Sequence, residues 1–148
     1  MPEVFNGARH QPRRVEPARH LQCVIITFGV LHGEPPEGDG YTVDLRTRLR
    51  NPHENPAMRH LTGLDQAVFD HVMNTDGVEE IVADTVSRAV SDLKHWGNPH
   101  GRICRVFVCC RGGRHRSVAV AEEIADRLYQ RGIGVQVEHR DIKKPIVQ

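Results

Sequence analysis

The residues best suited to chemistry lie in one stretch, 106–128, which reads VFVCCRGGRHRSVAVAEEIADRL. It passes from an apolar, β-like segment through a turn of glycines and arginines into a helix-like segment. The first turn of a helix leaves backbone N–H groups unpaired and carries partial positive charge. Glycine lets successive N–H groups point inward, and arginine offers phosphate a two-pronged donor. The turn therefore predicts an anion site built from Gly112, Gly113 and Arg116.

A cysteine-based reaction is the alternative for the same turn. Residues 110–117 fit C-x-x-G-x-x-R-S, a pattern similar to the phosphate loop of cysteine-dependent phosphatases. In that interpretation the Cys110 thiolate attacks phosphorus and Arg116 holds the phosphate oxygens. Cys109 stands where those phosphatases usually carry a histidine, and no W-P-D-like acid loop is present. We therefore favour a binding site without catalytic residues, in which Cys110 is a small polar wall.

The elements expected to position this turn alternate between strand and helix. Strands are predicted at 21–30, 41–45, 103–109 and 134–139, and helices at 62–74, 76–96 and 118–131. This order favours an α/β layered domain with a mostly parallel central sheet flanked by helices. Ligands of such sheets bind at the carboxyl ends of strands, which is where the turn lies.

The spacing of apolar residues and caps refines the helices. Thr62-Gly63-Leu64-Asp65 resembles a capping box that opens the first helix. In the second helix, spacings of three and four predict one buried face without a cofactor, made of Val82, Val86, Ala89, Leu93 and Trp96. Gly97-Asn98-Pro99 is predicted to stop that helix. Cys109 is expected to be buried under the sheet.

Composition bounds the remaining possibilities. The chain has 148 residues, which suggests one domain, and its net charge of +1 provides no global attraction to nucleic acid or membranes. No apolar run is long enough for a membrane span. Four cysteines without zinc-site spacing indicate a cytoplasmic protein with reduced thiols. Residues 1–20 are polar and predict a flexible tail, or alternatively a basic arm that touches RNA.

Several motifs in one order resemble the C-terminal domain of the RapZ/YvcJ family, the RNase adapter proteins. The family's turn is similar to C-T-G-G-x-H-R-S, and its long loop resembles N-P-H…P-x-L-R-x-L-T-G-x-D. Here the loop motif is Asn51-Pro52-His53, then Arg59 and Leu61-Thr62-Gly63. The resemblance covers about residues 21–144. A P-loop motif is absent, so the chain is interpreted as a stand-alone C-terminal domain at 21–148 behind a tail at 1–20.

The resemblance implies a function as well as a fold. In the family this domain recognises an amino-sugar phosphate, self-associates, and binds a small regulatory RNA for delivery to an endoribonuclease. We therefore expect a sensor of a phosphorylated small molecule that is also an RNA-binding adapter and a homo-oligomer. Neither a metal nor a cofactor is expected.

Site residues are carried over position by position. The resemblance implies ligand-binding residues at His53, Cys110, Arg111, Gly112, Gly113, His115, Arg116 and Ser117. Arg111 stands where the family usually has threonine, which adds charge to the site. The family's basic end, similar to K-R-K, is Lys144-Pro145-Ile146 here. The expected RNA contacts are Arg114, Lys143 and Lys144.

Overall fold

A single parallel sheet organises the computed structural model, which describes residues 20–49 and 51–146. The predicted tail therefore lies outside the described residues, apart from His20. The strands are β1 (Cys23–Gly29), β2 (Tyr41–Asp44), β3 (Cys104–Cys110) and β4 (Val135–His139). Their order is β2-β3-β1-β4, and every neighbouring pair is parallel. The α/β class with a parallel sheet is confirmed.

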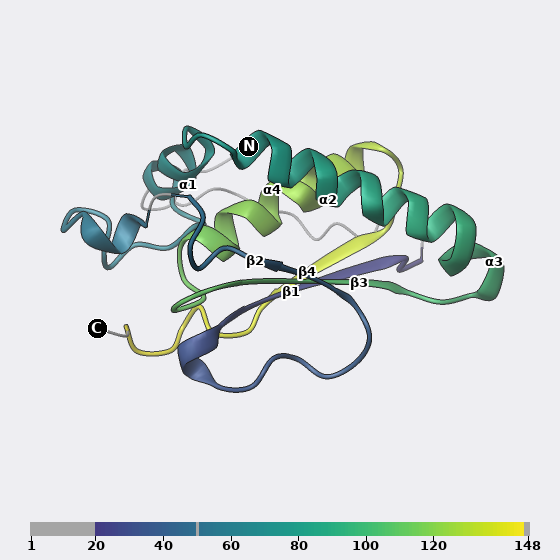
Figure 1. Cartoon of the computed structure of the whole chain (residues 1–148), viewed down its shortest axis with the longest axis horizontal. Helices are drawn as coiled ribbons and strands as arrows, with labels where there is room; N and C mark the ends of the chain where they lie inside the picture. The colour runs from purple at the N-terminus through teal and green to yellow at the C-terminus, as the bar shows by residue number, and fades with distance from the viewer. Residues whose placement is uncertain (1–19, 50, 147–148) are drawn as a thin grey trace, which may run out of the picture.

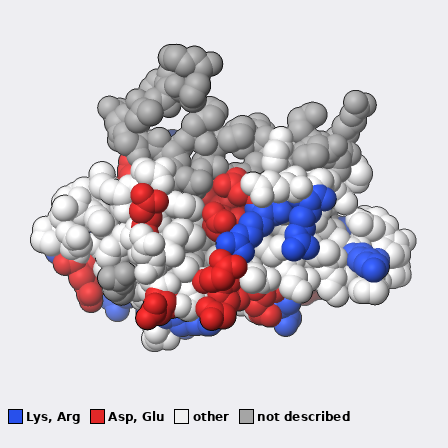
Figure 2. Space-filling model, turned by 90° about the horizontal axis from the view of Figure 1, so that it is seen from above, with Lys and Arg blue, Asp and Glu red and all other residues white. Residues whose placement is uncertain are grey.

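The long helices form a second layer on one face of this sheet (Figure 1). They are α1 (Gln66–Met73), α2 (Val78–Asp92) and α4 (Arg116–Gln130). Four short helical segments join the elements: η2 (Val30–His32), η3 (Pro52–Glu54), η4 (Leu93–Gly97) and α3 (Asn98–His100). Basic and acidic side chains lie side by side on the helix side of the molecule (Figure 2), in keeping with the net charge of +1.

The main core lies between the sheet and the helices. The predicted apolar face of α4 is fully buried there, with no exposed area at Val118, Ala121, Ala125 or Leu128. A smaller cluster of Phe28, Phe107 and Cys109 lies apart from this core. Cys109 is 2% exposed, so its predicted burial is confirmed.

The first helix begins later than the capping box predicts. The Thr62 N–H donates to Asp65 Oδ2 at 2.8 Å, and the Leu64 N–H donates to Thr62 Oγ1 at 3.1 Å. These bonds close a separate turn, and α1 starts only at Gln66. The turn is fixed from outside because the Gly63 N–H donates to the Arg114 carbonyl at 2.9 Å. The local hydrogen bonds between Thr62 and Asp65 therefore form as a capping box predicts, but they close a turn that precedes the helix.

The prediction for the end of α2 was wrong in two respects. The helix passes through the π-helical turn η4 into α3 and ends at Gly101, whose φ is +64°. Pro99 lies in the first turn of α3, where proline is tolerated. The wider π turn breaks the 3.6-residue period on which the predicted face depended. Leu93 is therefore buried, whereas Trp96 is 44% exposed and is not part of the core.

Candidate anion-binding site at the carboxyl ends of the strands

A pocket of about 500 Å³ lies where the strands end. It is enclosed by the segments that follow β2, β3 and β4 and by η3. Of the predicted ligand and RNA residues, it brings together His53, Cys110, Arg111, Gly112, Arg114, His115, Arg116 and Lys144. Gly113, Ser117 and Lys143 do not line it. For Arg46 the sequence left two possibilities open, a pocket residue or a surface ion pair, and it both lines the pocket and pairs with Asp44. The lining residues that were not assigned from the sequence are Thr47, Leu49, Asn51, Glu54, Pro145 and Ile146.

The two glycines of the turn have different roles. Gly113 has φ +69°, and a Cβ there would lie 2.5 Å from the backbone nitrogen of Gly29. The turn therefore packs its backbone directly against the end of β1. Gly112 has open space where a Cβ would be, and it lines the pocket. Gly113 is required by the fold, and Gly112 leaves room for a ligand.

Arg116, the first residue of α4, anchors the segment after β2. Its Nη1 donates to the carbonyl oxygens of Leu45, Arg46 and Arg48 at 2.9, 3.1 and 3.3 Å. The side chain is 3% exposed, and its burial lowers the pKa of the guanidinium from its ordinary value. Among the described residues, its Nε is the one buried side-chain nitrogen or oxygen without a hydrogen-bond partner. No carboxylate of residues 20–49 or 51–146 forms an ion pair with Arg116.

Arg114 also binds backbone carbonyls. Its Nε donates to Leu61 at 3.0 Å and its Nη1 to Ile142 at 3.1 Å, while Nη2 donates to the carbonyl of His60. The guanidinium thus ties the long loop before α1 to the segment after β4. An RNA contact through Arg114 remains a prediction, and it must coexist with these three bonds.

Two histidines line the pocket from opposite segments. The N–H of His53 donates to the Asn51 side chain at 3.1 Å, which fixes His53 within η3. His115 lies with Nε2 3.2 Å from the carbonyl of Arg59, so Nε2 must carry the proton in this contact. Burial, together with the nearby charge of Arg114, lowers the pKa of His115 to about 4. His115 is therefore neutral at neutral pH, with Nδ1 as an acceptor.

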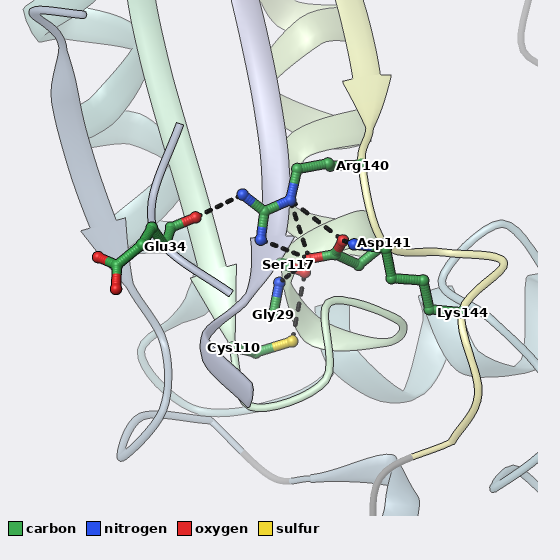
Figure 3. A network of polar contacts seen from close by, with 7 residues as sticks. All are labelled: Gly29, Glu34, Cys110, Ser117, Arg140, Asp141 and Lys144. Atoms are coloured by element: carbon green, nitrogen blue, oxygen red, sulfur yellow. Dashed lines mark hydrogen bonds and ion pairs between the residues drawn. The ribbon is translucent and has the colours of Figure 1, made fainter. Parts of the chain in front are cut away.

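Cys110 ends β3 at the base of the turn. Its thiol donates to Ser117 Oγ at 3.2 Å, and the residue is 3% exposed (Figure 3). In the phosphatase alternative the sulfur would have to reach phosphorus, and Arg116 would have to hold the phosphate oxygens. In this structure the thiol is buried and bonded to Ser117, and the Nη1 of Arg116 is bonded to three backbone carbonyls. The geometry fits the wall of a binding site better than a nucleophile.

A buried carboxylate that sequence reasoning missed binds Lys144, one of the lining residues of the pocket. Asp141 is 1% exposed and accepts the Gly29 N–H at 2.8 Å, Arg140 Nη2 at 2.9 Å and Lys144 Nζ at 2.6 Å (Figure 3). Burial raises its pKa, but these bonds outweigh that effect and leave the pKa at about 2. Its position directly after β4, at the carboxyl edge of the sheet, was the available signal.

The cations around the pocket are not all neutralised. Arg46 pairs with Asp44 at 2.7 Å, and Lys144 pairs with Asp141. Arg111 is exposed and forms no ion pair with any described residue. Glu54 is the one carboxylate among the lining residues. The pocket therefore carries a surplus of positive charge, which suits an anionic ligand.

A known protein family matches the part of the chain that forms the sheet, the long helices and most of the pocket. The family model described as the RapZ C-terminal domain matches residues 21–143. The chain belongs to the RapZ C-terminal domain family. The match contains the whole sheet, all three long helices and most of the pocket. Both the predicted resemblance and its extent are confirmed.

Curated relatives of this family are similar over most of the chain. An RNase adapter protein RapZ from Hamiltonella defensa is 36% identical over 85% of this chain and 44% of its own length. A nucleotide-binding protein from Salinispora tropica is 38% identical over 86% of this chain and 41% of its own length. Another from Thermotoga neapolitana is 39% identical over 81% and 42%. The chain thus spans less than half the length of these relatives.

Proposed function

We propose that this RapZ C-terminal domain binds the phosphate group of a phosphorylated small molecule in the pocket, and that the ligand is an amino-sugar phosphate. The observation that carries the proposal is Arg116, a buried cation without a carboxylate partner among the described residues, beside a pocket with surplus positive charge. An anion in the pocket would offset the cost of burying that charge.

In this proposal one set of lining residues binds the phosphate and another set binds the sugar. Backbone N–H groups of the turn and the positive end of α4 face the phosphate, and Arg111 adds an exposed guanidinium. His53, Glu54 and the Nδ1 of His115 offer polar groups to the sugar hydroxyls and the amine. Glu54 is the one carboxylate among the described lining residues, and a carboxylate binds the charged amine of an amino sugar. It therefore favours an amino sugar over a neutral sugar.

The adapter role is part of the same proposal. One relative is named an RNase adapter protein, so we propose that this domain works with a ribonuclease and RNA and associates with itself. Lys143 is exposed beside the pocket, and Lys144 lies in its wall. A ligand that engages Lys144 therefore changes the charge that Lys143 and Lys144 offer to RNA. A cytoplasmic location fits the four free cysteines.

Calorimetric titration with glucosamine-6-phosphate, glucose-6-phosphate and inorganic phosphate tests the proposal. We expect glucosamine-6-phosphate to bind more tightly than glucose-6-phosphate, and both to bind more tightly than phosphate. In Glu54→Gln the preference for the amino sugar should disappear while phosphate binding is kept. If none of the three compounds binds, the proposal is overturned. Release of inorganic phosphate from either sugar phosphate in the same mixtures would favour the phosphatase alternative.

Within the described residues, no helix is both long and apolar enough to cross a membrane.

A further inference from the structure

A second hollow lies at the other end of the sheet. It measures about 1150 Å³ and is open to solvent between the end of α2 and the starts of β2 and β3. In Figure 1 this end of the molecule carries α3, on the opposite side from α1. None of the residues predicted to bind a ligand or RNA lines it. We call it the Trp96 groove, after its most prominent side chain.

Trp96 is the single tryptophan of the chain, and it is 44% exposed at the wall of this groove. The π turn η4 places it there instead of in the core. Such turns are rare and are found frequently at functional sites. His100 lies beside the indole, with ring centroids 6.2 Å apart. The groove thus presents an aromatic surface that is partly exposed to solvent.

Three arginines surround this aromatic surface. The Arg102 guanidinium lies 5.8 Å from the centre of the Trp96 ring, and that of Arg88 lies 3.9 Å from the centre of the Tyr41 ring. Arg105 is exposed on β3 and lines the same groove. With every described residue considered, none of the three forms an ion pair. Elsewhere, carboxylates bind Arg46, Arg127 and Arg140.

An exposed indole beside guanidinium groups that form no ion pair with the described residues matches one ligand chemistry. Nucleic-acid bases stack on aromatic side chains, and arginines hold the adjoining phosphates. An apolar segment would leave the three arginines unused, and a purely acidic one would leave the indole unused. Asp39 and Asp92 at the groove wall add acceptors suited to the amino groups of bases.

We propose that the Trp96 groove binds a nucleotide unit, with its base stacked on Trp96 and its phosphate held by Arg102 and Arg105. We assign the unit to single-stranded RNA because unpaired bases are free to stack on aromatic side chains and the groove is open to solvent. This site lies at the opposite end of the sheet from Arg114, Lys143 and Lys144. It does not depend on a sugar phosphate occupying the anion pocket.

Binding in the groove can be followed by tryptophan fluorescence, because Trp96 is the only tryptophan of the chain. Emission excited at 295 nm should be quenched saturably by a ten-nucleotide oligoadenylate RNA and little by inorganic phosphate. Binding of the ten-mer at least about tenfold tighter than AMP assigns the groove to RNA. Equal affinity for AMP assigns it to a free nucleotide. Absence of quenching by both nucleotide probes overturns the proposal.

The RNA affinities of groove variants and of a control variant show whether the RNA binds in the Trp96 groove. With a fluorescein-labelled ten-mer followed by anisotropy, Trp96→Leu and Arg102→Gln should each bind at least about tenfold more weakly. Arg131→Gln is the charge-matched control, since Arg131 is exposed and lines neither hollow, and it should bind as the wild type does. Trp96 is exposed, so its replacement should leave the circular dichroism spectrum unchanged. Wild-type affinity in both groove variants, with weaker binding in Lys143→Gln, would overturn the proposal.

Discussion

The Nη1 of Arg116 donates to the carbonyl oxygen of Leu45 at 2.9 Å, which joins the start of α4 to the end of β2. The same nitrogen reaches the carbonyls of Arg46 and Arg48, so one side chain sets the course of the segment that forms a wall of the pocket. Arg116 is therefore a structural anchor and also a buried positive charge in the wall of the pocket.

Replacement of Arg116 by methionine should cost both stability and binding. It removes a charged donor from three carbonyls, and we expect the free energy of unfolding to fall by about 2–4 kcal/mol. Urea denaturation measures this loss. Arg111→Ala is the comparison, because Arg111 is exposed and should change stability by less than about 0.5 kcal/mol while still weakening anion binding. Equal stability of Arg116→Met and wild type would contradict the anchor role.

The two adjacent glycines should respond differently to alanine. Gly113→Ala places a Cβ 2.5 Å from the Gly29 nitrogen at φ +69°, and we expect a loss of more than about 2 kcal/mol. Gly112→Ala meets open space and should stay within about 0.5 kcal/mol of the wild type. Thermal unfolding of the two variants compares them directly. Similar melting temperatures would show that the turn does not need its close approach to β1.

His115 should make the protein sensitive to mild acid. Its pKa is about 4 in the folded state and ordinarily about 6.5, so the unfolded chain binds the proton first as the pH falls. Stability is fully kept above pH 6.5 and is lost progressively between pH 6.5 and 4, by up to about 3 kcal/mol from this group.

The matched variant for this effect is His115→Gln, whose amide can still donate to the Arg59 carbonyl but does not titrate. Urea denaturation at pH 7, 6 and 5 should show a steeper loss for the wild type than for the variant. Parallel loss in the two proteins would mean that His115 is not held neutral in the folded state.

Asp141 should act at lower pH and in the same direction, because its folded pKa is also below the ordinary value. Its folded pKa is about 2, below the ordinary 3.8, so it stabilises the fold above pH 4 and loses that effect as the pH falls toward 2. Asp141→Asn should lower the free energy of unfolding at pH 7 by about 2 kcal/mol. The difference from the wild type, measured by urea denaturation, should shrink at pH 3. A constant difference would mean that the ion pairs with Arg140 and Lys144 contribute little.

The order of strands and helices was predictable because hydrophobic periodicity and glycine–proline breaks are local signals. The position of the candidate site residues at the carboxyl ends of the strands was also predictable, since parallel strands place their ends at one edge of the sheet. The sequence does not reveal that Arg114 and Arg116 donate to carbonyls of distant segments. Nor does a 3.6-residue period show that a π turn moves Trp96 to the surface. Both features depend on tertiary contact.

The pocket-filling variant Gly112→Val gives the most direct test of the anion site. A Cβ at residue 112 meets no protein atom within 4 Å and the residue lines the pocket, so we expect a valine to leave folding unchanged and to reduce the space for a ligand. Calorimetric titration with glucosamine-6-phosphate should show binding to the wild type and affinity reduced at least about tenfold in Gly112→Val, with equal melting temperatures for the two unliganded proteins. Wild-type affinity in that variant would contradict the assignment of the ligand to this pocket.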